Sequence, residues 1–283
     1  MNAYLEDLTP FLDDPCWMVV LMAKQAPVGV ILRRGPTRWW HVSLWDTKHD
    51  KFESGQWFHG RIYPEKCDVS PDGKLLIYFA AKFGADPHNQ GYHDSWTAVS
   101  RPPYLTALAL WPIGGTWGGN GVFVDNQTVM IGWAGEPRNH PNHPPGPLHV
   151  LGWGAGGLSS EPSYDAGWQG GRDVRKPSGE LILGREWPIG RYFPSRTPTP
   201  YTLFRNDGEP VAIFEAHWAD WDQRGRLVAT VGGRVVAGKV TRDKRLVWRQ
   251  LADLHEERPT RLEAPDWAER WKPLPRRRRR PTA

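Results

Sequence analysis

The stretch CDVSPDGKLLIYF, residues 67–79, decides the fold that the sequence predicts. A short apolar run leads into the polar turn SPDG, which ends at Gly73, and a second apolar run follows it. Two β-prone runs joined by a short turn of Ser, Pro, Asp and Gly are typical of a β-hairpin. We therefore expect an antiparallel pair of strands in this stretch.

Similar segments recur along the chain. WADWDQRGRLVATV aligns with it without a gap, because Asp220 stands five residues before Gly225 just as Asp68 stands five before Gly73. Looser copies are GVFVDNQTVMIGW at 121–133 and VRKPSGELILG at 174–184, and a fainter one is KQAPVGVIL at 24–32. The equivalent positions 29, 73, 127, 179 and 225 are 44, 54, 52 and 46 residues apart. Such intervals are close to the roughly 40 to 50 residues of one β-propeller blade.

Further strand pairs lie between these hairpins, at 38–58, 202–218 and 234–251, and each is joined by an Asp, Asn or Gly turn. The sequence thus predicts an all-β chain: a β-propeller of about five four-stranded blades in one domain over residues 16–260. Residues 1–15 are expected to form an N-terminal cap, and 261–283 a C-terminal extension. We expect WMVVLMA, 17–23, to complete the last blade beside 245–254, because an open ring would expose strand edges.

The repeat resembles a known class of sequence. The turn SPDGK at 70–74, and Trp45-Asp46 in the place of the WD dipeptide, are similar to bacterial WD40-like repeats. This sequence departs from that pattern because no blade carries the Gly-His pair as well. The resemblance implies a propeller and points to no family of known function.

Composition supports strands and a folded, cytoplasmic protein. The chain has 30 Gly, 27 Pro and 17 Trp, and 12% aromatic residues are too many for a chain without a core. No run approaches the roughly 20 apolar residues of a membrane helix, and the acidic N-terminus is unlike a secretory signal. Cys16 and Cys67 are expected to be buried, inert side chains, and not a disulfide framework.

The net charge of +5 is located at one end of the sequence. Removing Arg276 to Arg280 from the 36 basic residues leaves 31, which equals the 31 acidic ones. The body is therefore electroneutral, which argues against a nucleic-acid-binding fold. The Arg run itself has two open readings: a site for polyanions or an anionic membrane surface, and a solvated terminus that confers solubility.

Several motifs suggest chemistry without completing a site. His88, His93, His140 and His143 have spacings that a metal could use, but zinc sites usually need four partners, so no metal is expected. The Gly-rich stretch 152–157 is not followed by a helical pattern, as a phosphate-binding loop would be. No nucleophile motif is present, and no cofactor is expected.

An alternative with catalytic function rests on Asp68, Asp220 and Asp222. If these carboxylates converged on the central channel, the chain could be a hydrolase acting on a glycan or small ester. Asp at the start of repeated hairpins also has a structural reading, since it accepts backbone hydrogen bonds in turns. Recurrence with the repeat favours the structural reading.

The favoured function is a non-enzymatic protein-interaction scaffold, with another protein as partner. Most Trp residues should pack between blades, but those in irregular segments could reach a partner, together with nearby Arg residues, because aromatics and Arg dominate interface energetics. The binding candidates are Trp96, Arg101, Trp117, Trp168 and Arg196. A propeller hydrolase is the first alternative. The second is an accessory that binds nucleic acid or an anionic surface through Arg276, Arg277, Arg278, Arg279 and Arg280.

Overall fold

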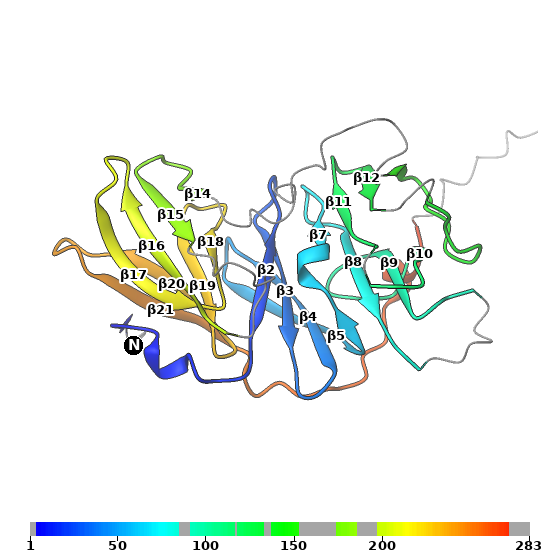
Figure 1. The fold of residues 1–283 in the computed structure, drawn as a ribbon, viewed down its shortest axis with the longest axis horizontal. Coiled ribbons are helices and arrows are strands. Elements are labelled where there is room, and N and C mark those ends of the chain that lie inside the picture. The colour runs from blue at the N-terminus through cyan, green and yellow to red at the C-terminus, as the bar shows by residue number, and fades with distance from the viewer. Residues whose placement is uncertain are drawn as a thin grey trace, which may run out of the picture.

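The computed structural model describes residues 4–84, 91–116, 118–132, 137–152, 174–185 and 197–271. These residues form five small sheets, which follow one another along the chain. The first sheet has the order β2 (Met18–Met22), β3 (Val28–Arg34), β4 (Trp39–Asp46) and β5 (Lys51–His59). Figure 1 places it in the middle of the molecule, with the second and third sheets on one side and the fourth and fifth on the other.

The second sheet has one interrupted strand. Its members are β6 (Arg61–Ile62), β7 (Asp68–Val69), β8 (Leu76–Ala81), β9 (Ser95–Ser100) and β10 (Ala109–Pro112). Both β6 and β7 pair with β8, and the 3-10 turn η2 (Pro64–Lys66) lies between them. Pro64 favours this break, because proline cannot donate a ladder hydrogen bond.

The third sheet differs from the antiparallel blades that the sequence predicts. It contains β11 (Gly121–Phe123), β12 (Thr128–Ile131) and β13 (His149–Gly152), and β13 runs parallel to β12. A parallel neighbour requires a crossover connection. Part of this connection pairs with β10, since His140 N donates to Leu110 O at 2.8 Å and Leu110 N donates to His143 O at 3.2 Å.

The last two sheets are antiparallel throughout. The fourth contains β14 (Val174–Arg175), β15 (Leu181–Arg185), β16 (Thr199–Arg205) and β17 (Pro210–Ala216). The fifth contains β18 (Trp218–Trp221), β19 (Leu227–Val231), β20 (Arg234–Val240), β21 (Leu246–Asp253) and the N-terminal β1 (Tyr4–Leu5). The short helices η1 (Thr9–Phe11) and α1 (Asp266–Glu269) lie outside the sheets.

The repeated turns of the sequence each join the first two strands of one sheet. The turn at Gly73 separates β7 from β8, and that at Gly225 separates β18 from β19. Gly73, Gly179 and Gly225 all have positive φ, at 74°, 78° and 70°, a conformation that glycine adopts without strain. The strand pairs expected at 38–58, 202–218 and 234–251 are also confirmed, as β4–β5, β16–β17 and β20–β21.

The pairing expected for residues 17–23 is wrong. These residues form β2, which pairs with β3, and it is β1 that pairs with β21 through Tyr4 opposite Arg249. The physical reason is that Met18 to Leu21 are buried and form the first strand of their own sheet, which the hairpin at 23–28 completes.

The sheets contact their neighbours through their first strands. β2 contacts β18 and β19 of the fifth sheet and β7 of the second, and β7 contacts β11 of the third. The buried Thr230 hydroxyl donates to Met18 O at 2.7 Å, and Gln25 N donates to Pro71 O at 2.8 Å. The fourth sheet joins the fifth where Arg185 Nη2 donates to Ala219 O at 3.0 Å.

Tryptophan supplies much of the core. Among the described residues, the buried Trp side chains are Trp17, Trp40, Trp45, Trp111, Trp218, Trp221 and Trp248. Cys16 and Cys67 are also buried, and neither forms a disulfide. Trp45 stacks on Phe52 with ring centroids 5.5 Å apart. No helix in the described ranges is long and apolar enough to span a membrane.

One guanidinium connects the fifth sheet to the first. Arg226 donates from Nε to Asp222 at 2.7 Å, and from both terminal nitrogens to Asp50 at 2.8 Å. Burial by itself would raise the pKa of Asp50, but the hydrogen bonds and charge of Arg226, followed by the charge of Arg249, bring it below its usual range. Arg226 Nη2 also donates to Thr47 O at 2.9 Å.

Replacing Arg226 with Met should destabilise the fold by about 3 kcal/mol, because Asp50 and Asp222 would lose their shared cation while staying largely buried. The measurement is urea unfolding followed by tryptophan fluorescence. Arg245→Met is the matched control, since Arg245 forms an exposed pair with Asp243 and should change stability little. Equal effects of the two substitutions would contradict this account of Arg226.

Candidate functional site

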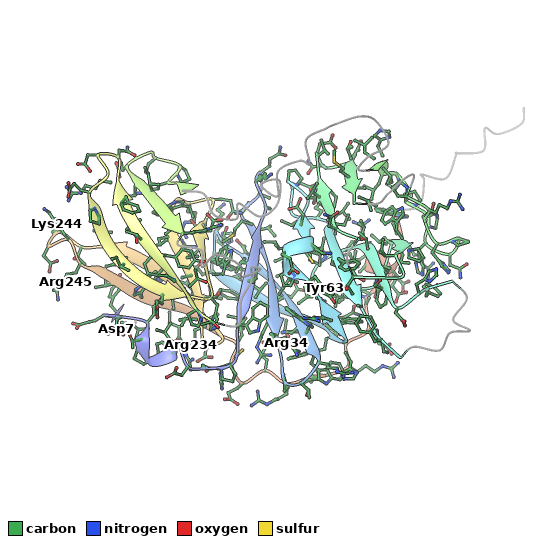
Figure 2. The ribbon with its side chains drawn as sticks, in the orientation of Figure 1. Asp7, Arg34, Tyr63, Arg234, Lys244 and Arg245 are labelled. Carbon is green, nitrogen blue, oxygen red and sulfur yellow. The ribbon has the colours of Figure 1, made fainter. Side chains whose placement is uncertain are left out.

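A hollow of about 810 Å³ opens where the first and second sheets meet. Figure 2 places Arg34 and Tyr63, which line it, in the middle of the molecule, far from Lys244 and Arg245 at the tip of the fifth sheet. Its walls come from the start of β2, the β3–β4 turn, the end of β5, β6 with η2, and the end of β8. The lining residues are Trp17, Arg34, Arg38, Trp40, His59, Gly60, Arg61, Ile62, Tyr63, Pro64, Glu65, Ala81, Lys82 and Phe83.

Arg34 lies at the edge of this hollow that the β3–β4 turn forms. Its Nη1 donates to Trp39 O at 2.9 Å, and its Nη2 donates to the carbonyl of Thr37, so the guanidinium closes the β3–β4 turn. Thr37 has a φ of 54°, which the tight turn requires. The guanidinium also lies 5.7 Å from the centroid of the Trp40 ring. Arg34 therefore carries a positive charge in a fixed position.

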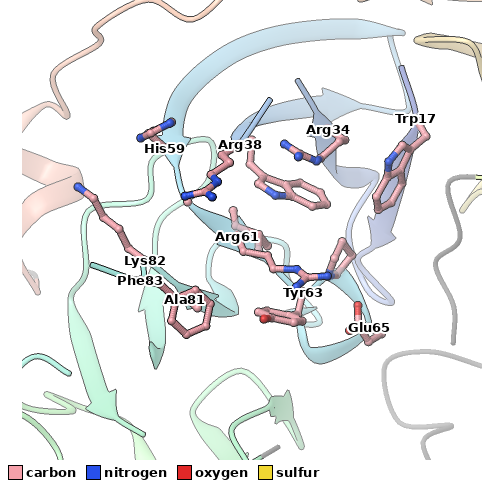
Figure 3. Close-up of a pocket in the computed structure, with 14 residues that line it drawn as sticks. Trp17, Arg34, Arg38, His59, Arg61, Tyr63, Glu65, Ala81, Lys82 and Phe83 are labelled. Atoms are coloured by element: carbon pink, nitrogen blue, oxygen red, sulfur yellow. The ribbon is translucent and has the colours of Figure 1, made fainter. Parts of the chain in front are cut away.

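Aromatic rings form the wall and floor. Trp17 meets Trp40 edge to face, with centroids 5.2 Å apart. Figure 3 shows Arg61 above the Tyr63 ring, and the distance from guanidinium carbon to ring centroid is 5.0 Å. Phe83 stands at the mouth with 58% of its surface exposed. Flat apolar rings beside cations provide both contact area and charge for a ligand.

The charge of the hollow is positive. Arg34, Arg38, Arg61 and Lys82 line it, whereas Glu65 is its one carboxylate. Arg38, Arg61 and Lys82 are exposed, and within the described ranges no carboxylate pairs with any of them. Burial raises the pKa of Glu65, and the charges of Lys66 and Arg61 only partly oppose this. Glu65 is therefore protonated more readily than an ordinary exposed carboxylate.

The residues proposed from the sequence lie mostly elsewhere. Trp96 was expected in an irregular segment, but it is a half-buried residue of β9 and packs edge-on against Phe58 at 5.9 Å. Arg101 is half-buried and lines a separate hollow of about 570 Å³, with its guanidinium carbon 6.0 Å from the Trp271 ring. Outside the described residues lie Trp117, Trp168, Arg196 and Arg276, Arg277, Arg278, Arg279 and Arg280.

Two of the histidines considered as metal ligands are engaged with Tyr92. The Tyr92 ring stacks on His140 with centroids 3.8 Å apart, and its hydroxyl donates to Nε2 of His143 at 3.0 Å. Nδ1 of His143 lies 3.0 Å from Ala107 O, so Nδ1 carries the proton. Burial lowers the pKa of His143, which favours this neutral ring. No group of three or more His, Cys, Asp or Glu residues in the described ranges is arranged to hold a metal ion, and His88 lies outside them.

The three Asp residues considered for hydrolysis hold the fold together. Asp68 accepts hydrogen bonds from Val69 N and, in the third sheet, from Phe123 N, both at 2.9 Å. Asp220 lies 3.3 Å from Arg185 of the fourth sheet. Asp222 caps its own turn by accepting from Arg224 N and Arg226 N. Asp222 thus has the turn-capping role that the sequence predicts, whereas Asp68 and Asp220 connect neighbouring sheets.

Asp68 should make stability depend on pH. Burial raises its pKa to about 6, above the value of about 3.9 of an unfolded chain. Its contribution is therefore present below the unfolded pKa and is lost as pH rises through about 6. Between pH of about 4 and about 7, the wild type should lose on the order of 2 kcal/mol relative to Asp68→Asn. Urea unfolding at a series of pH values measures this difference, and parallel pH profiles would refute it.

Sequence reasoning missed the basic and aromatic residues of the hollow. A local signal was present in RRGPTRWW, residues 33–40, where cations and tryptophans flank a turn. Arg61, Tyr63 and Lys82 carried no comparable signal, since they join the site only through the packing of the second sheet on the first.

Comparisons with known proteins identify no family. No family model matches the sequence, and no curated protein matches it. Among solved structures, a hydrazine synthase of Kuenenia stuttgartiensis is similar at 11% identity over 81% of this chain and 58% of that chain, with a TM-score of 0.22. A proposed 6-phosphogluconolactonase of Bacteroides fragilis is similar at 9% identity over 84% and 56%, with a TM-score of 0.20. The chain spans less than two thirds of either protein, and similarities this distant carry no argument about function.

Proposed function

We propose that the five sheets are the blades of a β-propeller, and that the chain is a binding module whose basic hollow receives an acidic segment of another protein. The support for this arrangement is the order of contacts in the described part of the chain: the fourth sheet meets the fifth, the fifth the first, the first the second, and the second the third. Five repeated hairpins at the start of five successive sheets are what propeller blades require.

The main support for a binding role is the excess of positive charge in the hollow between the first and second sheets. Four cations line it against one carboxylate, whereas the chain without its Arg run has equal numbers of basic and acidic residues. Three of those cations are exposed and lack an acidic partner in the described part of the chain. Unpaired cations beside aromatic rings favour a partner that brings carboxylates and apolar contact.

The site favours a protein partner over nucleic acid. A nucleic-acid surface is a long basic stripe that follows the phosphate backbone. Here four cations line one hollow of about 810 Å³, together with the rings of Trp17, Trp40 and Tyr63. The hydrolase alternative finds little support in the carboxylates considered for it, because Asp68, Asp220 and Asp222 are each engaged in bonds within the fold.

Removing the three exposed cations should weaken binding of an acidic peptide. The probe is a fluorescein-labelled peptide of Asp and Glu with one Tyr, and its binding is followed by fluorescence anisotropy. Arg38→Ala, Arg61→Ala and Lys82→Ala together should lower its affinity at least about tenfold, since each exposed charge contributes about 0.5 kcal/mol or more.

The control for that experiment removes the same net charge elsewhere. Lys51→Ala, Lys239→Ala and Arg242→Ala together change exposed residues that do not line the hollow, and they should leave affinity nearly unchanged. A chain ending at residue 275 should also bind the peptide normally. An equal loss in both triple variants, or a loss on removing the Arg run alone, would overturn the proposal. Tighter binding of a labelled oligonucleotide at the same hollow would replace it with a nucleic-acid role.

Glu65 should make this binding depend on pH. Because burial raises its pKa, lowering the pH neutralises Glu65 before ordinary carboxylates and removes its repulsion of an acidic ligand. Affinity for the peptide should therefore rise as pH falls from about 7 toward about 5. Glu65→Gln should bind more tightly at neutral pH and show a flatter profile, measured by the same anisotropy assay. A profile identical to that of the wild type would exclude Glu65 as the cause.

A further inference from the structure

The hollow of about 570 Å³ that Arg101 lines has a different chemistry from the basic hollow. It lies where the β7–β8 turn of the second sheet meets the β11–β12 turn of the third, beside the segment that precedes β13. We call it the Trp271 hollow. Leu75, Pro147, Leu148 and Trp271 supply its apolar wall, and its volume is in the usual range of a small-molecule site.

The indole of Trp271 has a fixed position in this wall. Its Nε1 donates to Pro144 O at 3.3 Å, and the ring packs against the core that the second and third sheets share. Gly146 makes this close approach possible, because an added Cβ would lie 2.4 Å from Trp271 Nε1. Gly146 also has a φ of 60°, which glycine adopts without strain. The ring therefore contributes a flat apolar surface whose place is set by the fold.

Arg101 brings a positive charge to this hollow. Its side chain is half-buried, and its guanidinium carbon lies 6.0 Å from the centroid of the Trp271 ring. Within the described ranges the guanidinium donates no hydrogen bond and forms no ion pair. Its Nε is buried, but its two terminal nitrogens are not, so they can donate to a ligand.

The other two charges that line the Trp271 hollow are paired with each other. Lys74 Nζ donates to Asp72 at 2.8 Å, and the Ser70 hydroxyl donates to the same carboxylate at 2.7 Å. Burial by itself would raise the pKa of Asp72, but these hydrogen bonds and the charge of Lys74 bring it below its usual range. Because Asp72 and Lys74 cancel, Arg101 leaves the hollow with one net positive charge.

We propose that the Trp271 hollow binds a small carboxylic acid with an apolar group, whose carboxylate accepts from Arg101 and whose apolar group contacts Trp271 and Leu148. One unpaired cation in an apolar wall matches a single negative charge attached to an apolar body. An acidic peptide fits this hollow poorly, because Asp72 repels further negative charges. The site is separate from the proposed acidic-peptide site, since the two hollows share no lining residue.

Binding of 4-fluorophenylacetate tests this site, because the compound joins one carboxylate to an aromatic ring. It is mixed with increasing amounts of the full chain at constant ionic strength and followed by fluorine NMR. Its resonance should shift or broaden in a saturable way. The alcohol 2-(4-fluorophenyl)ethanol has the same skeleton without the charge, and it should bind at least about tenfold more weakly, as expected when charge-assisted hydrogen bonds are lost.

Two variants assign the binding to the named residues. Arg101→Met keeps a long side chain without the charge, so it should weaken binding of the acid about tenfold and leave that of the alcohol nearly unchanged. Trp271→Ala removes apolar contact area and should weaken both compounds at least about threefold. Arg245→Met is the matched control at the far tip of the fifth sheet, where it should leave both affinities unchanged.

The proposal is overturned if the acid shows no saturable change, if acid and alcohol bind the wild type equally, or if Arg101→Met weakens both compounds equally. If Arg101→Met fails to fold, Trp271→Ala decides by itself, and unchanged affinities there contradict the site. The triple variant of Arg38, Arg61 and Lys82 should keep the acid while losing the acidic peptide, so the two proposals fail independently. Loss of the acid in that triple variant would place it in the basic hollow and overturn the proposal as well.

Discussion

The guanidinium of Arg226 connects the fifth sheet to the first. It holds Asp222 in its own hairpin and Asp50 in the turn between β4 and β5, so the fifth sheet is fixed against the first. Gln223 adds to this junction, with Nε2 donating to Ala23 O at 2.7 Å. Because both carboxylates are largely shielded from water, a charged network here restricts the relative position of the sheets more than exposed pairs would.

β2 lies between the fifth and the second sheets. β2 contacts the fifth sheet on one side and β7 on the other. Trp17, just before β2, is consequently placed at the boundary between sheets, where it lines the basic hollow of about 810 Å³. Buried Trp17 and Trp40 line this hollow beside Arg34 at the end of β3 and Arg38 in the β3–β4 turn. Rigid strands that present turns and chain ends are a common way to build a binding surface.

Polar side chains connect neighbouring sheets by hydrogen bonds and ion pairs. Asp68 and Asp220 use their carboxylates to connect neighbouring sheets, and Thr230 bonds across to β2. Arg33 is equally buried, and its Nη2 donates to His255 O at 2.7 Å. Because desolvating such groups is unfavourable, these bonds between distant segments are needed to keep the buried polar groups stable.

The sequence by itself determined the all-β class, the five repeated hairpins and the structural role of Asp222. Those features depend on local chemistry: glycines at positive φ, polar turns, and apolar runs of strand length. Tertiary structure alone decided the pairing of β1 with β21, the parallel β13 and the basic hollow between the first and second sheets. Trp96 illustrates the limit, because the sequence placed it in a loop and packing against Phe58 placed it in a strand. Arg33 and His255 are 222 residues apart, and no local pattern encodes a contact over that separation.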